Sequence, residues 1–287
     1  MKPLSELPAH AWADMAGVFT DIDDTLTTAG AMTPDALQAL ENLKTAGLHV
    51  IAVTGRPVGW SAPFALDWPL DAIVAENGAV ALTGGADTDA RNPPKNNHQN
   101  SLQRLSNKLK QLSKKYQTNH ATRLQNHARL QAVAARVLRE VPGATLAQDS
   151  AGRETDIAID HSEFHHLDAA GIAQVVAIMH AEGLNATVSS IHINGWIGQH
   201  DKWQGACWAA RELLGIDLAT EQARWIYMGD STNDQVMFQY FTHSVGVANI
   251  RRFEDQLQHR PRWVTQHARG AGFAEMAQRL LADRRCP

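Results

Sequence analysis

Two acidic segments contain the residue types best suited to chemistry. Asp21 and Asp23 lie in DIDDTLT, directly after the apolar run AGVFT, and Asp230 and Asp234 lie in GDSTND, directly after WIYM. Each apolar run predicts a buried strand, and in open parallel sheets ligands sit at the carboxyl ends of the strands. Within DIDDTLT the two carboxylates can take different roles, because one can attack a substrate while the other moves protons.

The two segments together predict a metal site. If both strands belong to one parallel sheet, their four carboxylates converge at one edge of it. Like charges at such range raise each other's pKa values and destabilise the site unless a cation neutralises them. We therefore expect a hard divalent ion that prefers oxygen ligands. Magnesium fits best, because it binds through few carboxylates plus a substrate phosphate.

Two further segments add groups that bind phosphate. VTGRP places the Thr54 hydroxyl and backbone N–H groups, that of Gly55 included, at the end of a third strand, and Lys202 in HDKWQG supplies a positive charge at a predicted helix start. Each piece alone is weak evidence, since an acidic residue after a strand is usually a turn or helix cap. Four such pieces in this order favour an active site.

Strands that alternate with helices must position these residues. Helices are predicted over about 34–46 and 203–214, each closed by a glycine. Buried strands are predicted over 16–20, 49–53, 72–75, 225–228 and 244–247. This alternation implies a parallel sheet with helices on both faces, so the predicted fold class is α/β with a Rossmann-like doubly wound core.

The middle of the chain has a different composition. Residues 84–100, GGADTDARNPPKNNHQN, are almost without apolar side chains and predict a linker. Beyond it the pattern predicts helices over 102–116, 123–140 and about 164–182, and strands over 155–159, 187–189 and 192–196. We therefore expect a core of residues 1–83 and 197–287, into which a compact α+β domain of residues 84–196 is inserted.

Composition limits the class of partner. The chain has 26 Lys and Arg residues against 30 Asp and Glu residues, so we expect no basic surface for nucleic acid or anionic lipid. The basic run LSNKLKQLSKKYQ is interpreted as the solvated face of a helix, not as an RNA-binding element. Cys207 and Cys286 lack the spacing of a disulfide framework or a zinc site, and no segment predicts a signal peptide or a membrane span. The expected partner is a small molecule in the cytoplasm.

The chemical segments resemble the four signature motifs of the haloacid dehalogenase superfamily, namely DIDDTLT, VTGRP, Lys202 and GDSTND. The resemblance implies that Asp21 is the nucleophile and that Asp23 protonates the leaving group and then activates water. It also implies that Thr54, with the adjoining Gly55, and Lys202 hold the phosphoryl oxygens.

The resemblance further implies a set of magnesium ligands. These are the carboxylates of Asp21 and Asp230 and the backbone carbonyl of Asp23, with Asn233 and Asp234 supporting the site.

One position departs from the family pattern. The family often has glycine after its second aspartate, where this chain has Asp24. We expect Asp24 to cap the local turn, because aspartate is favoured in that setting.

The inserted domain, between AENGAVAL and Lys202, looks like the large cap of subfamily IIB. That group includes sucrose and trehalose phosphate phosphatases, mannosylphosphoglycerate phosphatase and phosphomannomutase. Within AENGAVAL, Asn77 either shapes the site or occupies a hairpin turn, for which Asn-Gly is a preferred pair. Since the core handles only the phosphate, cap side chains must recognise the rest of the substrate. The polar candidates for this contact are Arg153, Glu154, Asp156, His192 and Asn194.

Three classes of function remain open. The first is a phosphatase that acts on a small phosphate monoester, such as a sugar phosphate. The second is a phosphomutase, which passes through the same phosphorylated Asp21. The third is a binding or scaffold protein, although loss of activity normally removes a nucleophile or metal ligand. A mutase needs a second phosphate site with several cations, and near the predicted cap strands mainly Arg153 is available, so hydrolysis is favoured.

Overall fold

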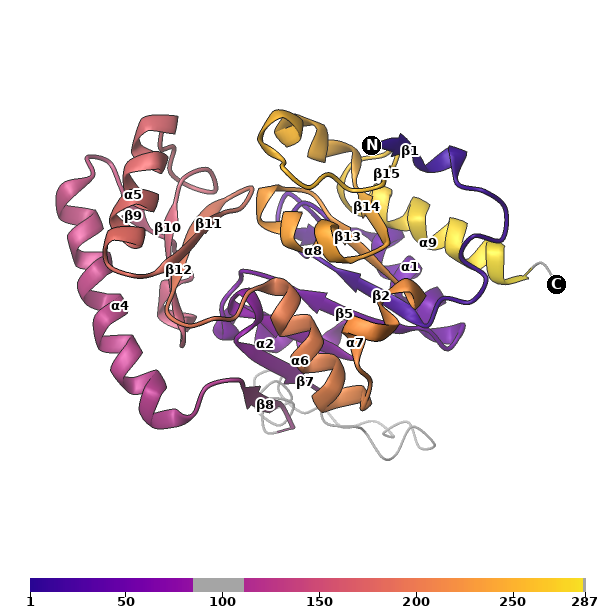
Figure 1. Ribbon diagram of the computed structural model, residues 1–287, viewed down its shortest axis with the longest axis horizontal. Coiled ribbons are helices and arrows are strands. Elements are labelled where there is room, and N and C mark those ends of the chain that lie inside the picture. The colour runs from indigo at the N-terminus through magenta and orange to yellow at the C-terminus, as the bar shows by residue number, and fades with distance from the viewer. Residues whose placement is uncertain (85–110, 286–287) are drawn as a thin grey trace, which may run out of the picture.

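The larger part of the molecule is built on a nine-stranded sheet. The computed structural model describes residues 1–84 and 111–285, and within them the strand order of this sheet is β1-β15-β14-β13-β2-β5-β6-β7-β8 (Figure 1). In that order the strands span Lys2–Pro3, Trp263–Val264, His243–Gly246, Trp225–Gly229, Gly17–Thr20, His49–Val53, Ala72–Ala75, Val80–Thr83 and Ser113–Tyr116. In this sheet order, all neighbouring strands from β1 through to β6 pair in parallel, whereas β7 pairs antiparallel with both β6 and β8. The predicted α/β class is confirmed.

Helices cover both faces of this sheet because successive strand residues point to opposite sides. On β2, Val18 belongs to the core on one face and Phe19 to the core on the other. The Val18 face is covered by α1 (Pro34–Thr45), α2 (Val58–Asp67) and α9 (Arg269–Arg285). The Phe19 face is covered by α6 (Lys202–Leu214), α7 (Leu218–Glu221) and α8 (Gln235–Tyr240). We call this sheet and its helices the large lobe.

A second sheet forms the small lobe. Its strand order is β11-β12-β10-β9, all antiparallel, with bounds Asn185–Val188, His192–Trp196, Asp156–Asp160 and Thr145–Leu146. The helices α4 (His120–Glu140) and α5 (Ala169–Ala181) pack on one face of it, against Ile157, Ile159 and Ile193. Strand alternation therefore turns Asp156 and Asn194 toward the large lobe, where Asn194 contacts the loop after β5.

Helix starts and ends follow the predicted capping chemistry. The Pro34 ring opens α1, and Gly47 beyond its end has a φ of 77°, a left-handed conformation that glycine adopts without a steric penalty. The Asp201 carboxylate accepts a hydrogen bond from the Gln204 N–H (2.7 Å) at the start of α6. This cap fixes the first turn of α6, which begins with Lys202.

The predicted helix over residues 102–116 is wrong where the structure describes it. Residues Ser113–Tyr116 form β8, which pairs with β7 through the register Val80 to Tyr116. Residues 102–110 of that segment, and the linker apart from its first residue, fall outside the described residues. Because β8 belongs to the large lobe, the sheet pairing also differs from the predicted domain boundary at residue 84.

The predicted helix over 164–182 begins later than expected. The α5 helix starts at Ala169, because Asp168 is its cap and accepts a hydrogen bond from the Gly171 N–H (2.8 Å). The residues before it form a loop. Sequence analysis did not predict α2, β7, α8 or α9. In the part of the chain that is described, no helix is long and apolar enough to span a bilayer.

Candidate active site

The two acidic segments meet where β2 and β13 end side by side. The two strands are parallel neighbours, and the Asp21 N–H donates to the Met228 carbonyl (2.8 Å), which extends their pairing by one residue. As a result, carboxylate oxygens of Asp21, Asp230 and Asp234 lie within 4.8 Å of one another, all buried. We call these three residues the carboxylate cluster. The predicted convergence of the two segments is thus observed for three of their carboxylates.

Lys202 reaches the cluster from the first turn of α6. Its Nζ lies 2.6 Å from Asp21 Oδ1 and 2.7 Å from Asp234 Oδ1, and its side chain is 2% exposed. A buried ammonium next to two carboxylates stays charged, and these neighbours raise the pKa of Lys202 against the effect of burial. Lys202 is therefore the buried cation of the cluster, and the half-exposed Arg252 reaches its third member, Asp230, at 3.2 Å.

Asp234 has its hydrogen-bonding capacity filled by the protein. Besides Lys202, its oxygens accept bonds from the Tyr227 hydroxyl and from the backbone N–H groups of Asp230 (2.8 Å) and Ser231 (3.1 Å). These bonds hold the GDSTND loop in place. Asp234 thus fixes the backbone that carries Asp230.

The remaining carboxylates of the cluster fit a hard cation. Burial raises the pKa of Asp21 to about 8 although Lys202 opposes the shift, and burial with the charges of Asp234 and Asp21 raises that of Asp230 well above its usual range. In the described structure Asp230 Oδ1 is buried and has no hydrogen-bond partner. An unpartnered oxygen in an all-oxygen donor set is what magnesium requires.

Asp23 lines the same cavity as Asp21 and binds Arg56. The Asp23 carboxylate accepts hydrogen bonds from Arg56 Nε (2.9 Å) and Nη2 (2.9 Å), a bidentate pair. Sequence analysis did not single out Arg56, although it stands in VTGRP beside Thr54 and Gly55. The sequence signal that could have identified Arg56 is its position directly after Thr54-Gly55, the pair predicted to bind phosphate.

Thr54 and Gly55 belong to the loop after β5 and line the same cavity as Asp21 and Asp23. The Thr54 hydroxyl accepts a hydrogen bond from the Arg56 N–H (3.0 Å), which fixes the turn after β5. The Gly55 carbonyl accepts bonds from two residues of the small lobe, Arg153 (3.1 Å) and Asn194 (3.2 Å). A Cβ at Gly55 would lie 3.1 Å from the Asn194 side chain, so glycine allows this close approach.

Residues 76–78, which follow β6 in the large lobe, form hydrogen bonds with both lobes. Glu76 and Asn77 both have positive φ angles, 50° and 53°, and the Asn77 N–H donates to the Thr54 carbonyl (2.9 Å). The buried Glu76 carboxylate accepts bonds from the backbone N–H groups of Glu154 (2.9 Å) and Thr155 (2.6 Å) in the small lobe. Asn77 therefore supports the loop that carries Thr54, and Glu76, which precedes it in AENGAVAL, anchors the small lobe.

The small-lobe candidates divide into two groups. Arg153 binds Asp156 (2.9 Å), and Asn194 binds Asp156 (3.3 Å), all of them buried; burial raises the pKa of Asp156 to about 7 against the effect of Arg153. His192 lines the cavity with Asn194. Glu154 instead binds Lys114 (2.9 Å) and the Tyr116 hydroxyl (2.6 Å) on β8, so the structure places it outside the cavity.

Two acidic residues of the small lobe join Arg56 and were not predicted. Glu163 Oε1 lies 2.7 Å from Arg56 Nη2, and Asp149 Oδ2 lies 3.2 Å from Arg56 Nη1. Asp149 also binds Arg153 (3.1 Å). We call Asp23, Arg56, Asp149, Arg153 and Glu163 the interface cluster. Nothing in the sequence around Asp149 or Glu163 marks them, because the contact depends on how the lobes meet.

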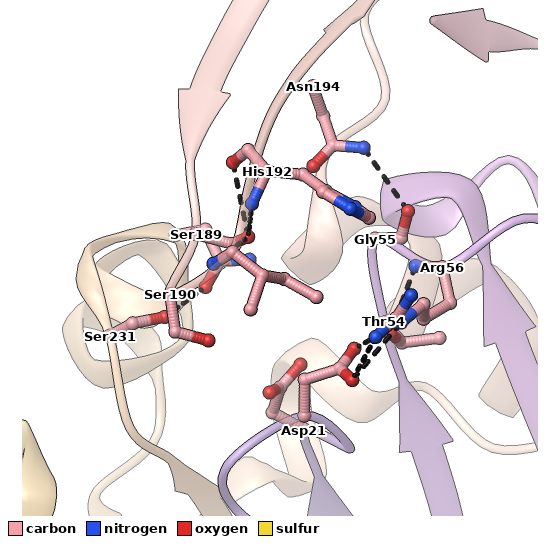
Figure 2. Close-up of a pocket in the computed structure, with 12 residues that line it drawn as sticks. Asp21, Thr54, Gly55, Arg56, Ser189, Ser190, His192, Asn194 and Ser231 are labelled. Carbon is pink, nitrogen blue, oxygen red and sulfur yellow. Dashed lines mark hydrogen bonds and ion pairs between the residues drawn. The ribbon is translucent and has the colours of Figure 1, made fainter. Parts of the chain in front are cut away.

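A small cavity separates the carboxylate cluster from the small lobe. Figure 2 shows Asp21 and Thr54 on one side of it and Ser189, His192 and Asn194 on the other. Its volume is about 10 Å³, roughly the room of one water molecule. The lobes are thus closed on each other in this structure. The lining residues are Asp21, Asp23, Thr54, Gly55, Arg56, Ser189, Ser190, Ile191, His192, Asn194, Ser231 and Asn233.

Comparison with known proteins agrees with this architecture. The family model of haloacid dehalogenase-like hydrolases matches residues 18–148. Among solved structures, a protein from Thermoplasma acidophilum has a TM-score of 0.65 at 14% identity, covering 93% of this chain and 99% of its own. The sucrose-phosphatase from Synechocystis, in complex with sucrose and phosphate, has a TM-score of 0.59 at 13% identity, covering 93% and 98%.

A third solved structure belongs to a sugar phosphatase of haloacid dehalogenase subclass IIB. Its TM-score is 0.60 at 13% identity, and the match covers 93% of this chain and 100% of that one. At such identities the structural matches establish the fold. No curated protein matches the sequence. The chain is thus similar to haloacid dehalogenase-like hydrolases in sequence over residues 18–148, and it shares the fold of these solved structures over nearly its whole length.

Proposed function

We propose that this protein is a magnesium-dependent phosphatase that hydrolyses a small phosphate monoester of the sugar phosphate class through an aspartyl phosphate on Asp21. The observation that carries the proposal is the position of Asp21, held by Lys202 at 2.6 Å within a buried carboxylate cluster at the strand ends. The family match and the fold shared with sugar phosphatases support the same reaction class.

The first step forms the covalent intermediate. An Asp21 carboxylate oxygen attacks phosphorus, the ester P–O bond breaks, and the leaving oxygen takes a proton from Asp23. Lys202, the Thr54 hydroxyl and the Gly55 N–H stabilise the phosphoryl oxygens as charge develops on them. Arg56 orients the Asp23 carboxylate through its two hydrogen bonds.

The second step releases phosphate. Asp23, now ionised, takes a proton from a water molecule whose oxygen attacks the aspartyl phosphate. The bond between phosphorus and the Asp21 oxygen breaks, which restores the carboxylate and yields inorganic phosphate. The closed lobes limit the cavity to about one water, which suits a hydrolysis in which bulk water must be excluded.

The metal site completes the proposal. Asp21, Asp230 and the Asp23 carbonyl would hold magnesium, with Asn233 and Asp234 in support, and the ion would neutralise the phosphate oxygens. The buried, unpartnered Asp230 Oδ1 fits this assignment.

The phosphomutase alternative is disfavoured by the small lobe. A mutase needs cations free to bind a second phosphate, but Arg153 is engaged by Asp149, Asp156 and the Gly55 carbonyl. We further propose a cytoplasmic location, given the two cysteines without a disulfide pattern. We also propose the predicted division into a catalytic core and a specificity cap, with β8 assigned to the core.

A phosphate-release screen tests the proposal. Purified protein is assayed with p-nitrophenyl phosphate and a panel of sugar phosphates, with magnesium and after EDTA treatment. We expect release that falls at least about a hundredfold without magnesium and returns when it is added back. Full turnover after exhaustive EDTA treatment would contradict the metal assignment.

A further inference from the structure

Beyond Asp23, the cavity-lining residues contact a layer of charges that already have partners. Asp149 and Glu163 bind the lining residue Arg56, and Arg153 binds the Gly55 carbonyl, so these three lie directly behind the cavity wall. All of the Arg56 nitrogens lie within hydrogen-bond range of carboxylates: Nε and Nη2 bind Asp23, Nη2 and Nη1 bind Glu163 at 2.7 and 3.3 Å, and Nη1 binds Asp149 at 3.2 Å. The Arg56 side chain is 5% exposed. Arg153 is engaged in the same way by Asp149 and Asp156.

The balance of charge on this wall is negative. Asp23, Asp149 and Glu163 face two guanidinium groups, and the count becomes more negative if Asp156 is ionised as well. His192 Nε2 lies 2.7 Å from Glu163 Oε2, so this ring contacts a carboxylate that Arg56 also binds. Among the described residues that line the cavity, Arg56 is the one with a permanent positive charge.

Glu163 is held in place by a buried residue that has no other evident task. Asp160, at the end of β10, accepts hydrogen bonds from the N–H groups of Ser162 (3.1 Å), Glu163 (2.9 Å) and Phe164 (3.0 Å). Its side chain is fully buried. The loop that presents Glu163 to Arg56 is therefore fixed before any substrate binds. Burial opposes the charge on Glu163, but the bonds with His192 and Arg56 outweigh it and lower its pKa to about 2.

We infer that Glu163, together with Asp149, selects substrates whose leaving group carries no second anion. The inference rests on the proposed phosphatase function, because it concerns the group that departs from the phosphate. A second phosphate or a carboxylate on the substrate would enter a wall with more carboxylates than cations. To bind this second anion, Arg56 would have to leave buried carboxylates unpaired. The free-energy penalty of those unpaired charges exceeds the stabilisation from the new contact. A neutral polyol finds acceptors in Glu163 and Asn194 and loses no ion pair.

The test compares esters that differ in one carboxylate. Glycerol 3-phosphate and 3-phosphoglycerate form one pair, glucose 6-phosphate and 6-phosphogluconate the other, and kcat/KM is measured from phosphate release. We expect the wild-type protein to prefer the neutral member by roughly tenfold or more. In Glu163→Gln, which keeps the size and a hydrogen-bonding oxygen, we expect that ratio to fall at least about threefold.

The matched control is Glu254→Gln. Glu254 pairs with Arg260 (3.2 Å) outside the cavity lining, and this variant should keep the wild-type ratio. A purely structural role of Glu163 would lower both kcat/KM values together and leave their ratio unchanged. If Glu163→Gln does not fold, Asp149→Asn carries the same expectation. A wild-type protein that prefers the anionic esters, or a ratio that neither variant changes, overturns the inference.

A binding measurement separates this inference from the phosphatase proposal. Dissociation constants of both pairs are determined by calorimetry with magnesium and the Asp21→Asn protein, which cannot turn them over. If no ester, p-nitrophenyl phosphate included, is hydrolysed by the wild-type protein, the phosphatase proposal fails. Tighter binding of the neutral members would still support charge selection, and tighter binding of the anionic members would refute it.

Discussion

The carboxylate cluster and the interface cluster both consist of buried charged groups, but they differ in how those charges are matched. In the carboxylate cluster, Lys202 pairs with Asp21 and Asp234, and Arg252 Nη2 lies 3.2 Å from Asp230 Oδ2, but Asp230 Oδ1 has no hydrogen-bond partner among the described residues. In the interface cluster, each of the three guanidinium nitrogens of Arg56 contacts a carboxylate. The first cluster is incomplete until something binds, whereas the second is complete before anything binds.

This difference separates the parts of substrate recognition. A site with unmatched negative charge attracts a divalent cation and, through it, a phosphate. A site whose ion pairs are complete binds a further charged group weakly, because one of the pairs must break. Hydroxyl groups bind more favourably there, because they form hydrogen bonds without breaking a pair. Under the proposed function, we expect the large lobe to bind the phosphate and the interface between the lobes to discriminate among leaving groups.

The largest expected effect is on the nucleophile. Asp21→Asn should lower kcat on the order of a thousandfold or more, because an amide cannot attack phosphorus although it fills the same volume. Phosphate release from p-nitrophenyl phosphate measures the loss, and circular dichroism checks that the variant is folded. Substantial activity in the folded variant would mean that another group attacks, and that the comparison assigns the chemistry to the wrong cluster.

A smaller effect concerns how pH changes the stability of the metal-free protein. Burial raises the pKa of Asp21 from 3.8 to about 8 in the folded state. The unfolded chain, with its ordinary value, loses this proton first as pH rises. The contribution of Asp21 to stability is therefore present below about pH 4 and is lost progressively as pH rises toward 8.

Magnesium should reverse this loss by binding the ionised carboxylates. We expect the rise in Tm on adding magnesium to be greater at pH 8 than at pH 6, by at least about 2 °C. Thermal scans at both pH values measure it, and Asp21→Asn should reduce the difference. An equal or smaller gain at pH 8 would indicate that the carboxylate cluster is not strained in the absence of the ion.

The smallest expected effect tests where the interface ends. Glu154 binds Lys114 and Tyr116 outside the cavity, so Glu154→Gln should change kcat/KM for the best substrate by less than about twofold. Asn194→Ala, which removes a cavity-lining amide, should lower it about tenfold. Steady-state kinetics of the two variants side by side provides the measurement. A large loss in Glu154→Gln alone would extend the substrate-binding surface to β8.

The sequence by itself determined the sheet core and the carboxylate cluster. Asp21 and Asp230 each follow a strand that a local apolar run predicts, and parallel pairing brings the ends of such strands together. The helix that carries Lys202 was equally evident, since its start and end are marked by local capping chemistry. The signals for these parts lie within a few residues of each other in the chain.

Only the tertiary structure decided the interface cluster. Arg56 and Glu163 are 107 positions apart, and their contact depends on how the small lobe is seated on the loop after β5. The same holds for β8, whose residues looked helical but are drawn into the sheet by the free edge of β7. The side chain of Glu154, which sequence analysis proposed as a substrate contact, instead binds Lys114 and Tyr116 on β8. Local patterns determine strands and helices, whereas the orientation of one lobe against another depends on contacts that no local pattern records.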